Sequence, residues 1–159
     1  MASTAVVIPR LKDFKYIVEI NGLEAALVQE FDPGVRTHGV TVHSSAGMNY
    51  VAKEVGMIGF SNCVLRTVVP AEGEGRNYWE LWMNQGQDPT TGNGLLPKQY
   101  RRDFNVFELK PDGVPCRVWY FVQGFPVSMK VNAKSSLDDS TDVIEFVEIA
   151  YQYRTVNIL

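Results

Sequence analysis

The residue types that most often carry out chemistry are scarce in this sequence. Its 159 residues include two histidines, His38 and His43, and two cysteines, Cys63 and Cys116. The histidines occupy one even and one odd position, so on an extended strand their side chains would point to opposite faces and could not share a metal ion. The cysteines have no C-x-x-C spacing, which excludes a four-cysteine zinc site. We expect two buried, reduced thiols, no metal and no cofactor.

A second candidate for chemistry is the segment 59–63, which is similar to the nucleophile elbow of hydrolases. It lacks the final glycine of that motif, and it continues as a strand-like run where an elbow needs a turn into a helix. A hydrolase acting through Ser61 or Cys63 would also need a histidine base and a third converging group. Glu145 and Glu148 would lie on opposite faces of a strand unless a bulge intervenes, so we interpret them as solvated or inter-subunit charges. We do not expect an enzyme.

Length and composition favour one globular domain, residues 1–159, since a domain typically has ~150 residues. Hydrophobic residues make up 45% of the chain, which excludes a disordered protein. The 15 Lys and Arg residues against 18 Asp and Glu give a formal net charge of −3. That balance argues against a nucleic-acid binder, although it leaves room for a local basic patch. Residues 1–9 lack a charged region and a long apolar stretch, so we expect synthesis in the cytoplasm without a signal peptide.

Alternation of apolar and polar residues dominates the sequence and predicts an antiparallel β protein. The predicted strands are 14–20, 58–69, 104–109, 114–122, 125–131 and 143–156. Asn21 with Gly22 would close a tight turn after the first strand, and residues 111–113 would close another before residue 114. In the last strand the apolar positions change from even to odd, which indicates either a β-bulge or burial on both faces.

One amphipathic helix is expected over residues 77–85. Asn77 would cap its first turn, Glu80 would reach back to the cap, and Gly86 would supply a left-handed stop. Its apolar face would consist of Tyr78, Trp79, Trp82 and Met83. We therefore predict a mainly β fold, an antiparallel β-barrel or sandwich, with this helix covering one end. Residues 85–100 and 134–142 are expected to be loops.

Residues 44–57 are the segment most suited to contact a partner. They show no clean periodicity but are rich in apolar side chains, and a monomer rarely leaves so much apolar surface on an irregular segment. The residues expected to make inter-subunit contacts are Met48, Asn49, Tyr50, Val51, Lys53, Val55 and Met57.

The order and spacing of these elements resemble the phage tail-tube protein family. Residues 14–23 are similar to the opening strand and turn of that family, and residues 124–127 to the entry of a later strand. Residues 143–151, with their two glutamates, are similar to its closing strand, and the Trp-rich helix lies between the two halves as in those proteins. The resemblance covers nearly the whole chain. It points to the inner tube protein of contractile phage tails and extracellular contractile injection systems.

The resemblance implies a structural role. In that family six subunits close a ring, and the rings stack into a hollow tube that a contractile sheath drives through a membrane. An extended hairpin corresponding to residues 44–57 reaches onto neighbouring subunits and the next ring. The implied partners are further copies of the chain, the sheath protein, baseplate or tube-end proteins, and a cargo of DNA or protein effector in the lumen, with no direct membrane anchoring. The long 85–100 connection leaves open a position at the tube end.

One alternative of another class remains open at this point. A small β-barrel could bind an apolar ligand in a pocket lined by Trp119, Tyr120 and Phe121. The formation of rings or tubes by the purified protein would separate the structural role from this alternative.

Overall fold

The computed structural model describes residues 15–21, 23, 27–70, 74–132 and 142–159. Phe14 and most of the expected 134–142 turn lie outside these residues. The described strands are β1 (Tyr16–Glu19), β2 (Val28–Asp32), β3 (Arg36–His43), β4 (Ala52–Phe60), β5 (Cys63–Val68), β6 (Arg102–Leu109), β7 (Pro115–Val131), β8 (Ile144–Ala150) and β9 (Tyr153–Ile158). The helices are the 3-10 turn η2 (Glu74–Asn77), α1 (Tyr78–Gly86) and α2 (Pro97–Tyr100). Every pairing between these strands is antiparallel, as expected.

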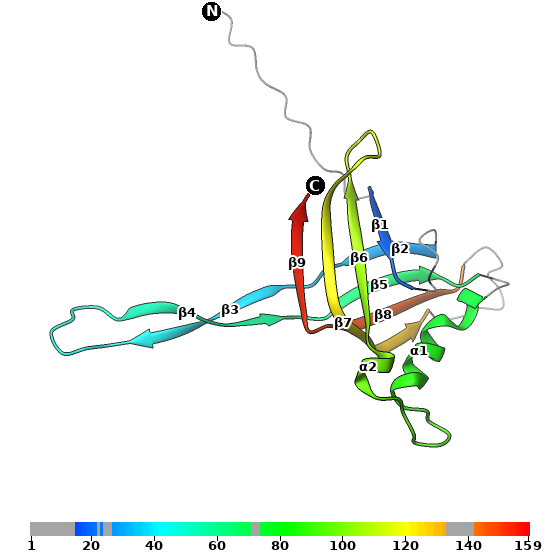
Figure 1. The fold of residues 1–159 in the computed structure, drawn as a ribbon, viewed down its shortest axis with the longest axis horizontal. Helices are drawn as coiled ribbons and strands as arrows, with labels where there is room; N and C mark the ends of the chain where they lie inside the picture. The colour runs from blue at the N-terminus through cyan, green and yellow to red at the C-terminus, as the bar shows by residue number, and fades with distance from the viewer. Residues whose placement is uncertain (1–14, 22, 24–26, 71–73, 133–141) are drawn as a thin grey trace, which may run out of the picture.

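The long strand β7 connects the two layers of the body. Its first part pairs with β6 and β9, and its second part pairs with β8, giving the order β1-β6-β7-β8-β5-β2 with β9 beside β7. The sequence predicted two strands here, but the chain bends without leaving the sheet. Gln123 has a φ of 59°, and a side chain on the buried Gly124 would come within 2.9 Å of the Phe104 ring. The bend folds the sheet into a sandwich whose layers cross in Figure 1.

Stacked aromatic rings fill the space between the layers. Phe104 on β6 and Phe121 on β7 lie parallel with ring centroids 4.6 Å apart, and both are 1% exposed. Phe31 and Tyr151 meet Phe121 edge-on at 5.6 and 4.9 Å. Aromatic pairs prefer these offset and edge-to-face arrangements. The core therefore draws on β2, β6, β7 and the segment that follows β8.

Helix α1 covers one end of this sandwich by its tryptophans, as the apolar spacing predicted (Figure 1). Trp79 and Trp82 are each 1% exposed. The Trp79 Nε1–H donates to Thr67 Oγ1 at 3.0 Å, and the Trp82 Nε1–H donates to the Tyr100 carbonyl at 2.6 Å. Burial with a satisfied N–H is the usual condition for a core tryptophan.

The ends of α1 differ from the prediction. Asn77 occupies the position before the helix, but its side chain makes no capping hydrogen bond. Gly86 is the last helical residue instead of a left-handed stop, and the chain leaves through Gln87 in an extended conformation, whose N–H donates to the Met83 carbonyl. The helix is held by the packing of its apolar face and does not depend on these two caps.

A second short helix, α2, interrupts the segment predicted as a loop. Pro97 stands at its first position, where the missing N–H costs nothing. Gln99 reaches back so that its Oε1 accepts a hydrogen bond from the Leu96 N–H at 3.0 Å. The Arg101 N–H closes the turn on the Pro97 carbonyl at 3.0 Å. The fold thus has two α-helices among the described residues where the sequence analysis expected one.

The predicted last strand is two strands, β8 and β9, and β8 carries no bulge. Its register with β5 is continuous from Cys63↔Ile149 to Val68↔Ile144. Its odd positions face the core, so Phe146 stays 38% exposed and the even apolar positions are on the outer face. The irregularity belongs to the partner strand, where Val127 of β7 is the extra residue between Pro126 and Ser128. Both explanations offered for the phase change in 143–156 are therefore wrong.

The predicted strand 58–69 is also divided, because the chain changes direction at Ser61 and Asn62. β5 enters the body, whereas β4 leaves it and pairs with β3 in a separate two-stranded sheet. Figure 1 shows this β3–β4 hairpin extending far beyond the sandwich.

Candidate assembly surface

The hairpin formed by β3, residues 44–51 and β4, called the arm below, is the most exposed element of the fold. All eight residues of β3 are exposed. The hydrophobic residues of the arm that remain largely exposed are Val40 (64%), Val42 (58%), Met48 (38%), Tyr50 (75%), Val51 (47%), Val55 (73%), Met57 (89%) and Ile58 (48%). A two-stranded hairpin of this kind is marginally stable alone, and contiguous apolar surface of this kind usually marks an interaction site.

The register gives the outer part of the arm one apolar and one polar face. Val40 pairs with Val55 and Val42 with Lys53, so these side chains share a face. Thr41 pairs with Glu54 and His43 with Ala52 on the other face. There the His43 Nε2 lies 3.3 Å from the Glu54 carboxylate. The arm therefore offers a partner a stripe of valines backed by polar groups.

Two glycines allow the arm to twist at its middle. The register shifts between His38 and Val40, with one extra residue on β4. At this point a side chain on Gly56 would lie 3.1–3.2 Å from the backbone of Gly39, so the two strands approach closely there. Such a bulge increases the local twist of a hairpin. Met57 lies in the bulge and is the most exposed large hydrophobic residue of the arm.

The tip of the arm is a turn that presents an aromatic and a thioether side chain. The Met48 N–H donates to the Ser45 carbonyl at 3.1 Å, and Gly47 has a φ of 89°. Tyr50 is 75% exposed. The turn therefore exposes Met48 and Tyr50 to solvent, where they could contact another molecule.

All seven residues predicted to contact another subunit lie in the arm, although the segment is more regular than predicted. Met48, Asn49, Tyr50 and Val51 belong to the tip, and Lys53, Val55 and Met57 belong to β4. Sequence reasoning missed Val40, Val42 and Ile58, which are equally exposed. The alternation of Val40 and Val42 with Thr41 and His43 is the pattern in the sequence that indicates a strand with one apolar face.

The residues proposed for an apolar ligand pocket are engaged in packing and in hydrogen bonds within the described part of the chain. Phe121 is closed within the aromatic stack. The Trp119 Nε1–H donates to Glu108 Oε1 at 3.0 Å, and the guanidinium groups of Arg117 and Arg154 lie over its ring, 5.4 and 4.9 Å from its centroid. The structure therefore does not support the ligand-binding alternative.

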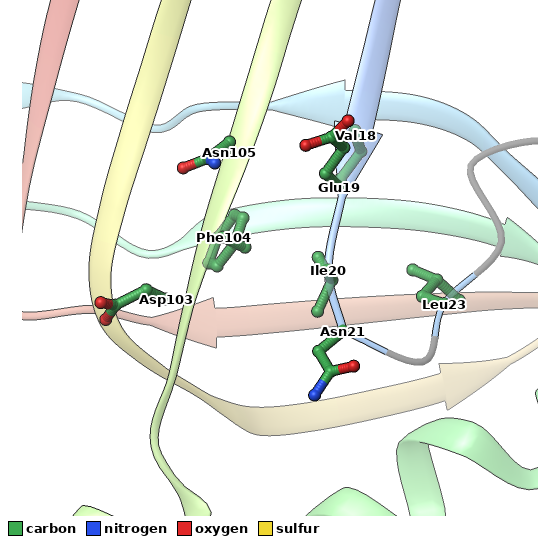
Figure 2. Close-up of a pocket in the computed structure, with 8 residues that line it drawn as sticks. All are labelled: Val18, Glu19, Ile20, Asn21, Leu23, Asp103, Phe104 and Asn105. Carbon is green, nitrogen blue, oxygen red and sulfur yellow. The ribbon is translucent and has the colours of Figure 1, made fainter.

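The hollow shown in Figure 2 gives no support to the binding of an apolar ligand. It measures about 350 Å³ and lies between β1, β6 and the turn after β1. Its lining combines the apolar side chains of Val18, Ile20, Leu23 and Phe104 with the polar side chains of Glu19, Asn21, Asp103 and Asn105. Half of its eight lining residues are polar or charged and the hollow is open to solvent, whereas an apolar ligand needs an enclosed pocket with few polar groups.

The candidate nucleophiles have structural positions. Cys63 is fully buried, and desolvation raises the pKa of its thiol to about 12, so it stays protonated at neutral pH. The Ser61 Oγ accepts a hydrogen bond from the Val35 N–H at 2.6 Å at the base of the arm. Cys63 and Cys116 are both free thiols, as expected, but Cys116 is only half-buried.

The two glutamates lie on opposite faces of β8, but one of them was assigned to the wrong environment. Glu148 is exposed and its Oε2 accepts a hydrogen bond from the Asn62 side chain at 3.4 Å. Glu145 was expected to be solvated or inter-subunit, yet it is 9% exposed and paired with Thr67 in the sheet. Desolvation, followed by the negative charge of Glu80 on α1, raises the pKa of its carboxyl.

The described part of the chain also bears on metal binding and on membrane insertion. No group of three or more metal-ligating side chains gathers there. None of its helices has the length and apolar character needed to cross a bilayer.

Several solved structures share this fold. The anti-feeding prophage cap, described as a tube terminating cap, superposes with a TM-score of 0.77 at 13% identity over 99% of this chain and 97% of that one. The sheath-tube complex of the PVC extracellular contractile injection system gives 0.73 at 15% identity over 94% and 93%. Hcp1 from Flavobacterium johnsoniae gives 0.52 at 12% identity over 90% and 94%.

Sequence comparison assigns the family. No match to a curated protein was found. The family model described as T4-like virus tail tube protein gp19 matches residues 12–155, which include every described strand and helix except the last residues of β9. This match agrees with the resemblance of the opening strand, the helix and the closing segment noted in the sequence. The chain belongs to the family of T4-like virus tail tube protein gp19.

Proposed function

We propose that this chain is a structural subunit of the inner tube of a contractile tail or injection system. Six copies close a ring, and the rings stack into a hollow conduit for cargo. Membership of the tail tube family supports this role. The observation that carries the proposal is the arm, because its apolar side chains have no core to pack against within their own chain.

The energetics of burial favour an arm that docks on other copies. A buried side chain of the size of Val, Met or Tyr contributes about 1.5–3 kcal/mol relative to its exposed form. In a closed ring the same contact recurs at every interface, so a modest gain per subunit is multiplied through the assembly. The contact residues are Met48, Asn49, Tyr50, Val51, Lys53, Val55 and Met57, and we add Val40 and Val42 from the same face as Val55.

The other partners follow from the same role. Related structures include a sheath-tube complex and a baseplate, so we propose that the assembled tube contacts a sheath protein outside and baseplate or tube-end proteins at its ends. The lumen holds the cargo, DNA or a protein effector. The buried, protonated Cys63 and the structural hydrogen bond of Ser61 support a subunit without catalytic activity. We propose that residues 1–159 act as one domain, which the extent of the family match supports.

Substitution of the arm tip tests the proposal. Met48→Asp with Tyr50→Asp places two charges where we expect a neighbouring subunit. Circular dichroism and thermal melting of the isolated subunit should stay close to the parent, since both side chains are exposed. Sedimentation velocity and negative-stain microscopy should show the loss of the rings and tubes that the parent forms.

The matched control keeps the apolar character of the tip. Met48→Leu with Tyr50→Phe should still assemble, because only burial of apolar surface is required of these positions. Normal tubes from the double aspartate variant would refute the role of the tip. Unfolding of that variant would show that the two residues stabilise the subunit itself.

A further inference from the structure

The arm is connected to the body by a compact joint where the chain leaves through residues 33–35 and returns through residues 61–62. The Val35 N–H donates to Ser61 Oγ, and the Ser61 N–H donates back to the Val35 carbonyl at 2.9 Å. The Gly34 N–H donates to Asp32 Oδ1 at 2.9 Å. Gly34 has a φ of 71°, and a side chain there would come within 2.5 Å of the Asn62 carbonyl oxygen. These bonds hold the two ends of the arm to each other.

Arg154 of the body holds this joint from outside. Arg154 is the one residue of β9 that is not exposed. Its Nη1 donates to the Pro33 carbonyl and, at 3.2 Å, to the Gly34 carbonyl. The same guanidinium lies 5.9 Å from the ring of Phe60, at the end of β4. Arg154 thus contacts both the outgoing and the returning strand of the arm.

Arg154 is itself held in place by the body. Its guanidinium lies 4.9 Å from the Trp119 ring centroid on β7. Tyr151 supports the same joint, because its hydroxyl donates to the Pro33 carbonyl at 3.3 Å and its ring lies 5.7 Å from that of Phe60. Hydrogen bonds from a charged donor are stronger and more directional than neutral ones. Arg154 therefore links the arm to the sandwich through bonds of defined direction.

We propose that Arg154 is the positioning residue that sets the direction of the arm relative to the body, and thereby the geometry in which subunits join. This inference rests on the proposed function of the arm in assembly. It goes beyond that function because it assigns the control of the arm to a residue outside the arm.

The length of the arm explains why its base must be held tightly. The eight residues of β3 span about 26 Å at the rise per residue of a strand. A rotation of about 10° at the joint would therefore move the far end of β3 by about 4.5 Å, close to the separation of neighbouring strands in a sheet. A looser joint would place the apolar stripe of the arm a full strand away from its docking position.

The direction of the arm can be measured without assembly. Spin labels at Asn49→Cys on the tip and Asn157→Cys on β9, in a Cys116→Ser background, would report the distance between arm and body by pulsed electron paramagnetic resonance. Cys63 is fully buried and remains unlabelled. In dilute, unassembled protein, Arg154→Met should at least double the width of the distance distribution, and Arg154→Lys should give an intermediate width because it keeps the charge but loses the planar fork.

Arg117→Met is the matched control. Arg117 also lies over the Trp119 ring, but its guanidinium bonds to Glu108 instead of the arm carbonyls. Its loss should leave the distance distribution unchanged. The protein concentration required for tube formation should rise about tenfold in Arg154→Met, as expected if the fraction of subunits that hold the arm in the docking direction falls to about a tenth.

The outcomes separate this inference from the proposed function. A distribution of parental width in a folded Arg154→Met overturns the inference, whatever its assembly. If that variant does not fold, Arg154→Lys decides, and a parental width there overturns it equally. A broadened distribution with undiminished tube formation also overturns the inference, because the direction of the arm would then not control assembly. Normal tubes from the double aspartate variant of the tip would instead refute the proposed contact and leave the broadening in Arg154→Met intact.

Discussion

Replacement of Trp82 by alanine should remove a large part of the stability of the subunit. Trp82 is 1% exposed, its ring stacks on Trp79 with centroids 5.8 Å apart, and the guanidinium of Arg102 lies 4.7 Å from its centroid. The change also leaves the carbonyl of Tyr100 without its indole donor. Truncation of a buried tryptophan costs about 3–5 kcal/mol. Because a chain of this size loses about 2–4 °C per kcal/mol, we expect the midpoint of thermal unfolding to fall by about 6–20 °C.

Urea denaturation of the unassembled subunit, followed by tryptophan fluorescence and circular dichroism, would measure the change. Leu81→Ala is the control on the same helix, because Leu81 is 55% exposed and its truncation should change the free energy of unfolding by less than about 0.5 kcal/mol. A loss below about 1 kcal/mol for Trp82→Ala would refute the reasoning. It would mean that α1 packs on the sandwich without contributing to its core.

Three further predictions concern single side chains. Burial raises the pKa of Glu145 above the 4.5 of a free carboxyl, so the folded state binds this proton more tightly than the unfolded state and loses stability as the pH rises through the folded-state pKa. Glu145→Gln should therefore raise the melting temperature at pH 7.5 but not at pH 4. Equal shifts at the two pH values would contradict this prediction. In the native protein at pH 8 the thiol of Cys63 should resist alkylation while that of Cys116 reacts, and mass spectrometry in denaturant without reductant should find no bridge between them. Gly34→Ala should lower the free energy of unfolding by more than about 1 kcal/mol, because the φ of Gly34 is 71° and the Asn62 carbonyl oxygen would lie 2.5 Å from the new Cβ. Gly113→Ala should lower the free energy of unfolding less, because Gly113 has a φ of 87° but open space around it. Calorimetry would compare the two variants.

The parts of the fold that were predicted correctly depend on contacts between close neighbours in the sequence. Helix α1 was predicted from the spacing of its aromatic residues, and the antiparallel class from period-2 alternation. The turn before Val114 also formed as expected: the Gly113 N–H donates to the Lys110 carbonyl at 2.8 Å, and Gly113 has a positive φ. Helix α2 was predictable in principle, since Pro97 and Gln99 have the spacing of a helix start, but the surrounding glycines suggested a loop.

The errors concern how strands continue, which depends on partners distant in the sequence. Alternation before and after Gln123 suggested two strands, and the structure keeps them as one because β7 pairs with β6 and β9 on one side of the bend and with β8 on the other. The phase change in 143–156 was attributed to a bulge or to burial on both faces, whereas β8 keeps its odd positions toward the core throughout and carries the apolar Ile144 and Phe146 on its outer face. A single sequence shows apolar residues on both faces of the segment but cannot show which face the rest of the fold covers.

The candidate site was predictable for a related reason. Residues 44–57 do not fit any core pattern, and local patterns that conflict with a stable monomer are concentrated at functional sites. The direction of the arm was not predictable, because it depends on Arg154, more than a hundred positions away from the carbonyls that it holds. In the sequence Arg154 is one cation among the exposed residues of a terminal strand. Only the fold brings its guanidinium to the place where the arm begins, so the residues that we propose for the interface could be named from the sequence, whereas the direction that we propose for the arm depends on contacts between the arm and the body.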